Sequence, residues 1–249
     1  IEEERITRVK HDRFLPYNSI ATCLSQSNYS IEDVDCLALA GIKANFENKM
    51  KRKKQDKYFK DFTHYLLSAL SKKLNKKVDL PCEYYHHHYC HIMSAYAFSS
   101  FKDALVVSMD GKGDGLAGLV YSVQNETFEE LAKIETKNSL GILYEHVTTW
   151  LGYSFYDEYK IMGLAPYGKP ERFKALFVKH IRMRPDGLFT VMLESLMKDL
   201  SQVSTQRQPG TEFSQDNKDL AASLQQCIER ILKDFFSFWS KKTGLKKLI

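Results

Sequence analysis

The feature that most constrains this chain of 249 residues is the apolar run 104–109, which ends in the glycine-rich hexamer Asp-Gly-Lys-Gly-Asp-Gly at 110–115. Two further β-rich runs follow at 116–123 and 128–134, separated by a short polar turn. A short apolar run bounded by turn residues is typical of a core strand. The stretch therefore predicts a strand, a glycine loop and a β-hairpin. In P-loop and Rossmann proteins a helix follows the glycine loop, so this order argues against both.

The glycine loop itself predicts a phosphate site. Gly111 and Gly113 would let backbone N–H groups approach phosphate oxygens. Asp110, at the end of the strand, could position Mg²⁺ or a nucleophile. This strand–loop–strand context suits the phosphate hairpin of actin-like and sugar-kinase-like ATPases. A plain hairpin turn or a calcium-like turn is the alternative.

A second feature is the histidine cluster at 86–91. His87 and His91 are four residues apart, a spacing that places both side chains on one face of a helix. Two imidazoles so placed can hold one divalent metal ion. His86 and His88 point elsewhere on such a helix, and Cys90 has a different helical phase. A histidine-rich surface turn, or histidines buried in a core, is the alternative.

The rest of the chain predicts helices and strands in alternation. Strands and helices are mixed without a clean linker, which predicts one α/β domain with a mixed sheet. Helices are expected at 16–27, 58–74, 87–99, 139–151, 170–182 and from Asp216 or Asn217 to about Lys242, a strand at 34–40, the beginning of a strand at 245–249, and loops at 157–168 and 192–216.

Composition limits the function classes. No run of eighteen apolar residues exists, so no membrane span is expected. Five widely spaced cysteines without a CxxC motif argue against a disulfide framework and a zinc ribbon, and favour a reducing cytoplasm. Segment 43–60 carries eight Lys or Arg residues against two acidic residues. We interpret it as a solvated loop between a strand and a helix, with a nucleic-acid patch as the alternative.

Five segments together resemble one enzyme family. Their residue types and order are similar to those of the carbamoyltransferases that include nodulation carbamoyltransferases and antibiotic O-carbamoyltransferases. The segments are Glu-Glu-Arg-Ile-Thr-Arg-Val-Lys-His-Asp at 3–12, His-His-x-x-His followed by Ser-Ala-Tyr at 87–96, Val-Ser-Met-Asp-Gly-x-Gly-Asp-Gly at 107–115, Ser-Leu-Gly-x-Leu-Tyr at 139–144 and Glu-Tyr-Lys-Ile-Met-Gly-Leu-Ala-Pro-Tyr-Gly at 158–168.

The resemblance implies an N-terminal domain with the actin-like ATPase fold, a mixed sheet flanked by helices. It implies that a smaller C-terminal domain makes carbamoyl adenylate from carbamoyl phosphate and ATP. The N-terminal domain would then pass the carbamoyl group to a hydroxyl of a small acceptor, sugar-like or antibiotic-like. Iron(II), or zinc(II) as the alternative, would bind His87 and His91. Lys10 and Asp110 would lie near the nucleotide. His88 and Asp114 are the candidates for the base that deprotonates the acceptor.

The resemblance also sets limits. The family's first strand, a third metal ligand and the adenylate-forming domain would lie outside residues 1–249. A threonylcarbamoyl transferase acting on tRNA, with the basic run 49–54 touching RNA, is one alternative, and a non-catalytic nucleotide- or metal-binding module is another. Neither a membrane nor a nucleic acid is the expected partner. The sequence leaves open whether the chain forms an oligomer.

Overall fold

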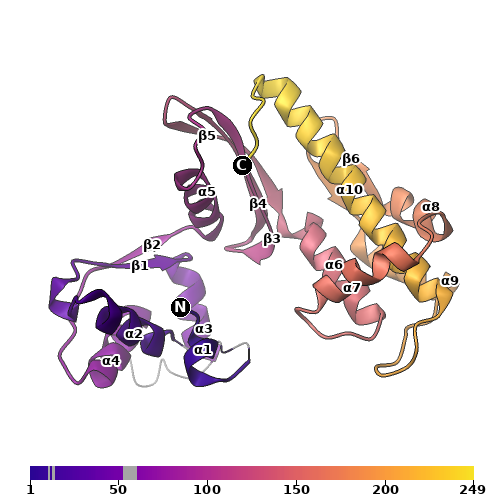
Figure 1. The fold of residues 1–249 in the computed structure, drawn as a ribbon. Coiled ribbons are helices and arrows are strands. Elements are labelled where there is room, and N and C mark those ends of the chain that lie inside the picture. Colours follow the sequence, from indigo (N-terminus) through magenta and orange to yellow (C-terminus); the bar gives the residue numbers. More distant parts are fainter. Residues whose placement is uncertain (11, 13–14, 53–60) are drawn as a thin grey trace. The chain divides into compact units, whose positions relative to one another are not determined.

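The computed structural model describes residues 1–10, 12, 15–52 and 61–249. The described chain divides into two compact units, Ile1–His87 and His88–Ile249, and each is taken by itself. Helices and strands occur in both units, so the expected α/β class is confirmed (Figure 1). The strands form three small sheets instead of the one mixed sheet that the sequence predicts.

The first unit is a set of short helices around a two-stranded parallel sheet. Helix α4 supplies its buried face through Phe62, Leu66 and Leu70, which pack with Ile31 and Val78. Their spacing of four residues explains why one side of α4 is apolar. The elements are α1 (Glu3–Thr7), α2 (Tyr17–Ser27), η1 (Ile31–Asp33), β1 (Leu37–Ala40), α3 (Lys43–Arg52), α4 (Phe62–Leu74) and β2 (Cys82–Tyr85).

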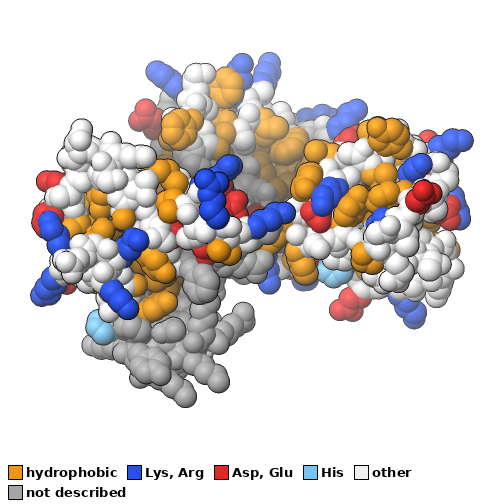
Figure 2. All heavy atoms as spheres, turned by 60° about the horizontal axis from the view of Figure 1, so that its bottom comes forward, with side chains coloured by type: hydrophobic (Ala, Val, Ile, Leu, Met, Phe, Trp, Pro, Cys, Tyr) orange, Lys and Arg blue, Asp and Glu red, His pale blue; other side chains and the backbone are white. Residues whose placement is uncertain are grey.

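Two predictions for this unit need correction. The strand expected at 34–40 is shorter and alternates between half-buried and exposed residues, because β1 pairs only with β2. The basic segment is helix α3 from Lys43 to Arg52, not a loop. The remainder of that prediction, 53–60, lies outside the described residues. On the described part of the face in Figure 2, Lys and Arg side chains are scattered among hydrophobic and acidic ones.

The second unit is built on an antiparallel meander covered by helix α5. The hairpin turn predicted at 124–126 is confirmed: Asn125–Glu126 joins β4 to β5. The glycine loop predicted at 110–115 is shorter than expected, because β3 runs to Gly113 and only Asp114–Gly115 joins it to β4. All four turn residues have positive φ, as two-residue hairpin turns require. The elements are α5 (His87–Ala97), β3 (Ala104–Gly113), β4 (Leu116–Gln124) and β5 (Thr127–Glu135).

The end of the chain extends this sheet. Leu248 lies parallel to Leu105 on the free side of β3, with Leu105 N donating to Lys247 O and Val107 N to Ile249 O, each at 2.9 Å. The expected beginning of a strand at 245–249 is therefore confirmed at its last residues. It gives β3 a parallel neighbour on one side and an antiparallel one on the other.

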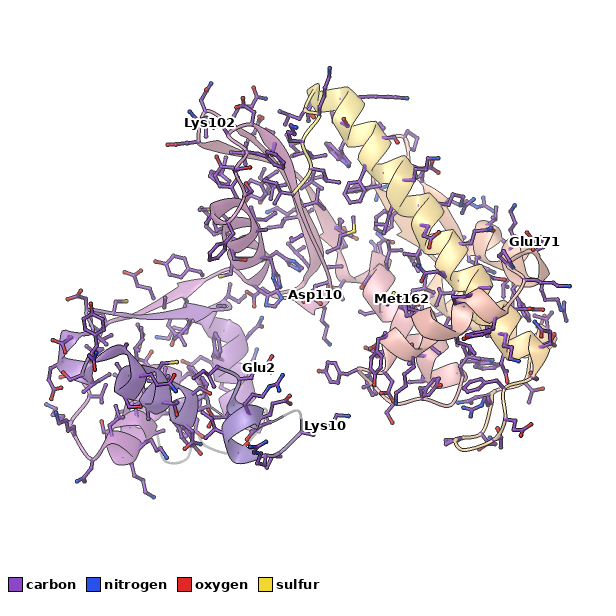
Figure 3. All side chains as sticks on the ribbon, viewed as in Figure 1. Glu2, Lys10, Lys102, Asp110, Met162 and Glu171 are labelled. Atoms are coloured by element: carbon purple, nitrogen blue, oxygen red, sulfur yellow. The ribbon has the colours of Figure 1, made fainter. Side chains whose placement is uncertain are left out.

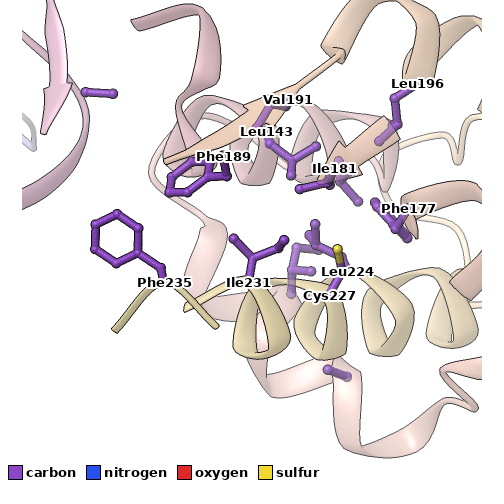
Figure 4. Close-up of a cluster of buried hydrophobic side chains, with 14 of the residues drawn as sticks. Leu143, Phe177, Ile181, Phe189, Val191, Leu196, Leu224, Cys227, Ile231 and Phe235 are labelled. Carbon is purple, nitrogen blue, oxygen red and sulfur yellow. The ribbon is translucent and has the colours of Figure 1, made fainter. Parts of the chain in front are cut away.

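Helices and a small hairpin form a second layer around α10. Helix α10 packs against α7, α8 and β6, and its apolar face enters the main core of the unit (Figure 4). Ser214 caps its N-terminus, and Gly244 ends it with a φ of 73°. The elements are η3 (Thr136–Asn138), α6 (Leu140–Trp150), α7 (Glu158–Leu164), η4 (Ala165–Tyr167), α8 (Glu171–His180), β6 (Ile181–Met183), β7 (Phe189–Val191), α9 (Leu193–Val203) and α10 (Gln215–Thr243).

The loop predicted at 157–168 is wrong, and the loop predicted at 192–216 is wrong in its first part, while residues 204–214 form a loop as expected. Segment 157–168 forms helix α7 and the turn η4, with Ile161 and Leu164 buried. Segment 192–216 begins with helix α9, whose Leu196 and Leu200 are fully buried in the main core. In each segment a pair of apolar residues lies on one helix face, Ile161 and Leu164 in α7 and Leu196 and Leu200 in α9, and burial of that face stabilises the helix.

Candidate functional site

Helix α5 is fixed on the sheet by His88. This side chain is fully buried; one ring nitrogen lies 3.1 Å from Leu116 O and the other 3.2 Å from Ser108 Oγ. Ser108 Oγ in turn accepts from Leu119 N at 3.1 Å. A buried imidazole that is hydrogen-bonded on both sides is a packing residue. Both ring nitrogens of His88 are engaged in these contacts, and its role as a general base stays a prediction.

His87 and His91 lie one turn apart at the start of α5. The boundary between the two units falls after His87, the first residue of this helix. A third side chain joins them from β3: His87, His91 and Asp110 each offer a ligand atom, and these atoms lie within 4.8 Å of one another. The Nε2 atom of His91 is 3.9 Å from Oδ2 of Asp110. Atoms bound to one ion at about 2.0–2.2 Å can be up to roughly 4 Å apart, so the distance between His91 and Asp110 fits a shared ion.

Asp110 takes this position because β3 is irregular there. The register with β4 shifts between Met109 and Gly113, so the glycine segment is a bulged strand end and only Asp114–Gly115 is a turn. A bulge redirects side chains. Asp110 Oδ1 accepts from Gly111 N at 2.6 Å, which orients the carboxylate. The sequence pointed to Asp110 near a nucleotide and placed the third metal ligand beyond residue 249; it gave no signal for this bulge.

Asp114 has a conformational role at the hairpin turn. Its φ is 50°, in the left-handed region that Asp tolerates better than most residues. It lies close enough to α5 that burial first, and the charge of Asp114 second, raise the pKa of the Cys90 thiol. Asp114 is not one of the three clustered ligand residues. Gly113 ends β3 and is buried, and its predicted contact with a phosphate stays a prediction.

Lys10 belongs to the first unit, where it is exposed in the turn after α1. Its proposed contact with a nucleotide phosphate stays a prediction.

The N-terminus of α6 packs directly on the backbone of the bulge. A Cβ added to Gly141 would lie 2.8 Å from the Cα and 2.9 Å from the N of Gly111, so only glycine permits this approach. Ser139 caps α6 by accepting from Ile142 N at 3.0 Å, and its hydroxyl donates to Asp110 O at 3.2 Å. The helix N-terminus, which favours anions, is therefore held beside Asp110 and Gly111.

A pocket of about 580 Å³ opens at the same place, within the size range of small-molecule sites. Figure 3 labels Asp110 on β3 and Met162 on α7, two of its lining residues. The full lining is Met109, Asp110, Gly111, Leu140, Gly141, Tyr144, Glu145, Tyr156, Glu158, Tyr159, Met162, Gln225, Ile228 and Leu232. A smaller hollow of about 270 Å³ shares Met109, Asp110, Gly111, Leu140 and Gly141 with it.

Polar side chains on the pocket wall are held in place by hydrogen bonds to one another. Tyr144 donates its hydroxyl hydrogen to Gln225 Oε1 at 3.1 Å, and Gln225 donates to Glu229 Oε1 at 2.8 Å. Burial, and then the charges of Glu158 and Glu229, raise the pKa of Tyr144 to about 12, so it stays a donor at neutral pH. Sequence reasoning missed these residues. Tyr144 and Glu158 lie in two of the segments that carry the resemblance, but no role was assigned to them. The spacing of Tyr159 and Met162 was a further signal, because it puts both on one face of α7.

Side chains that can bind a metal ion lie beside a pocket that has apolar walls and a few polar groups. This combination is typical of an enzyme active site. Residues 1–249 match the family described as Carbamoyltransferase N-terminus over their whole length. The chain therefore belongs to this carbamoyltransferase family.

Two nodulation proteins are among its relatives. Nodulation protein NolNO of Sinorhizobium fredii is 34% identical over 253 residues, covering 100% of this chain and 37% of the relative. Nodulation protein NolO of Bradyrhizobium diazoefficiens is 37% identical over 162 residues, covering 65% of this chain and 30% of the relative. The chain thus spans roughly a third of the length of these two proteins. In the described part of the chain, none of the helices combines the length and the apolar character needed to cross a bilayer.

Proposed function

We propose that this chain is the acceptor-transfer part of an O-carbamoyltransferase, in which carbamoyl adenylate, made from carbamoyl phosphate and ATP, gives its carbamoyl group to a hydroxyl of a small, sugar-like or antibiotic-like acceptor. One observation carries the proposal: Asp110 belongs both to the cluster of metal-ligating side chains and to the lining of the 580 Å³ pocket. A bound metal and a bound nucleotide would therefore lie next to each other.

The metal proposed for the cluster is iron(II), with zinc(II) as the alternative. Two imidazoles and one carboxylate match the ligand set of iron(II) sites that keep open positions. When bound, the ion would act as a Lewis acid on an oxygen of the substrate and offset negative charge on the departing phosphate. His87, His91 and Asp110 would hold it, and Gly111 N would keep the Asp110 carboxylate oriented. Mg²⁺ on Asp110 is the further candidate, because oxygen ligands suit it.

The nucleotide proposed for the pocket is ATP or carbamoyl adenylate. The phosphates would lie against Gly111 and the first turn of α6, where backbone N–H groups and the helix dipole favour anions. The base and ribose would occupy the apolar part of the pocket, between Met162 on α7 and Ile228 on α10. The protonated hydroxyl of Tyr144 supplies a directional polar group on that wall.

The fold proposed for the family is the actin-like one. In the second unit, the C-terminal residues, β3, β4 and β5 are neighbours in this order, with a parallel pair on one side of β3 and antiparallel pairs on the other. This is the pattern that the resemblance implies for the sheet.

The test is a transfer assay with the full-length protein, carbamoyl phosphate, ATP, iron(II) and a panel of hydroxyl-bearing acceptors, with products analysed by mass spectrometry. Wild-type protein should release AMP and a carbamoylated acceptor. His91→Ala should lose transfer, while Asp114→Asn, at the neighbouring turn, should keep it. Absence of AMP and of carbamoylated product with every acceptor would contradict the proposal.

A further inference from the structure

The loop between α6 and α7 forces an aromatic residue into a strained backbone conformation at the edge of the pocket. Residues Ser154–Asp157 form a tight turn, closed by a hydrogen bond from Asp157 N to Ser154 O at 3.2 Å. Tyr156, the third residue of this turn, has a φ of 70°. Phe155 before it is not in the positive-φ region, so the turn follows the type II pattern, which favours glycine or asparagine at its third position. A tyrosine there is unfavourable, since its Cβ crowds the backbone.

Both ends of the loop are fixed, so the strain is retained. At the start, Arg207 Nη1 donates to Leu151 O at 2.8 Å, and the Arg207 guanidinium lies 3.8 Å from the ring centre of Phe213. Phe213 also stacks on Tyr153, with ring centres 5.6 Å apart. Gly152, with a φ of 77°, leaves room for this arginine.

The other end of the loop is held by Asp157. Its carboxylate accepts from Ser154 N at 3.2 Å and pairs with Lys160 Nζ at 2.8 Å. Residues in such conformations persist only when their surroundings hold them, and they concentrate at ligand sites.

The strained residue lines the pocket and keeps a large part of its surface accessible. Tyr156 is 55% exposed, and Tyr159 and Met162 on α7 are 60% and 56% exposed. All three line the 580 Å³ pocket, whereas Phe155, the neighbouring exposed aromatic residue, does not. The turn therefore directs the Tyr156 ring, and not the Phe155 ring, to the pocket.

We propose that Tyr156 is a binding residue whose ring covers the base of the nucleotide by stacking, and that the turn holds it in this conformation at a cost to stability. The inference rests on the proposed nucleotide pocket. A planar base fits this role because aromatic rings stack on any base through their faces. The base would lie between the Tyr156 ring and the apolar pocket wall formed in part by Met162.

The experiment compares variants of Tyr156 with control variants in the 249-residue chain. Isothermal titration calorimetry measures ATP binding, and thermal melting without ligand measures stability. Tyr156→Gly and Tyr156→Asn remove the ring and replace it with residues that adopt a positive φ more readily. Both variants should keep or raise the melting temperature. Both should weaken ATP binding roughly tenfold, the effect expected from the loss of one base–aromatic stack. Tyr156→Phe keeps the ring and should bind ATP as wild type does.

Two matched controls separate stacking from general effects of substitution. Phe155→Ala removes the adjacent exposed ring outside the pocket. Glu126→Gly relieves a positive φ of 63° in the β4–β5 turn. Neither should change ATP affinity, and Glu126→Gly should keep or raise the melting temperature, as Tyr156→Gly does.

Each contrary outcome has its own meaning. If ATP binds to wild type and equally well to Tyr156→Gly and Tyr156→Asn, the inference is wrong while the nucleotide pocket stands. If Tyr156→Phe loses as much affinity as Tyr156→Gly, the hydroxyl and not the ring makes the contact, which also overturns the inference. If wild-type protein does not bind ATP, the proposed nucleotide pocket fails and the inference fails with it.

Discussion

The carboxylate of Asp110 lies 3.9 Å from the imidazole of His91, and this pair connects the end of β3 to the first turns of α5. His87 adds a third ligand atom within 4.8 Å. The hydrogen bonds of His88 fix the rotation of α5 and so the position of His91. The bulge in β3 fixes the direction of the Asp110 side chain. His91 and Asp110 are therefore arranged before any ion binds.

A metal ion bound by these groups should stabilise the chain. Ligand binding to the folded state adds roughly 2.7 kcal/mol when the free ion is at about a hundred times its Kd. Iron(II), or zinc(II), should raise the melting temperature of wild-type protein in differential scanning calorimetry, and Asp110→Asn should reduce that rise. Asp114→Asn, a carboxylate change at the adjacent turn, is the control and should leave the rise intact. An equal rise in both variants would place the ion elsewhere.

Gly141 should tolerate no side chain, whereas Gly111 should tolerate one. A Cβ at Gly141 would meet the Gly111 backbone at 2.8 Å, but a Cβ at Gly111 has no heavy atom within 4 Å. Gly141→Ala should therefore lower the free energy of unfolding by about 1–3 kcal/mol, as expected for overpacking, and weaken ligand binding in the pocket. Urea unfolding of the two variants side by side checks this. Equal stability would show that α6 does not sit this close to β3.

Replacing His88 should affect folding more than chemistry. His88→Ala removes a buried ring and leaves Ser108 and Leu116 without their partner, a loss of about 2–3 kcal/mol for two buried hydrogen bonds. Denaturant unfolding should show this loss, and the remaining folded protein should still bind metal through His87 and His91. A fully stable but inactive His88→Ala protein would instead restore His88 as a catalytic residue.

Glu3 should make the first unit sensitive to acid. Burial alone would raise the pKa of Glu3, but hydrogen bonds from the backbone and side chains of Ser19 and Asn18 outweigh it, and the pKa is lowered. A carboxyl whose pKa is lower in the folded than in the unfolded chain stabilises the fold above the unfolded value, about 4.3 for glutamate. That contribution is lost as the pH falls through the folded value.

The variant Glu3→Gln tests this linkage. It should be less stable than wild type at neutral pH, and the difference should shrink as the pH falls below about 4. Circular dichroism melts over a pH series measure it, with Glu4→Gln as a neighbouring control that should change little. A difference between wild type and Glu3→Gln that stays constant with pH would contradict the role of the charge.

The sequence predicted most of the second unit because its signals are local. The hairpin turn at Asn125–Glu126, the cap at Ser139 and the stop at Gly244 each depend on residues that are near one another in the chain. Helices α7 and α9 were missed because their stability comes from burial of a few apolar residues against α10 and α8. Local composition does not contain that information.

The candidate site was predictable to a smaller extent. Helical spacing identified His87 and His91 as a pair, and the strand end identified Asp110 as a functional residue. Their meeting depends on a β-bulge and on the packing of α5, which only the folded chain defines. The pocket wall is likewise assembled from β3, α6, α7 and α10, which are far apart in sequence.

The most direct test of the central claim is metal content. Wild-type protein, His91→Ala, Asp110→Asn and the control His64→Ala, from helix α4 of the first unit, are purified anaerobically with iron(II) and analysed by elemental mass spectrometry. The account predicts a bound ion in wild type and in His64→Ala, and its loss from both His91→Ala and Asp110→Asn. Equal metal content in all four proteins would contradict it.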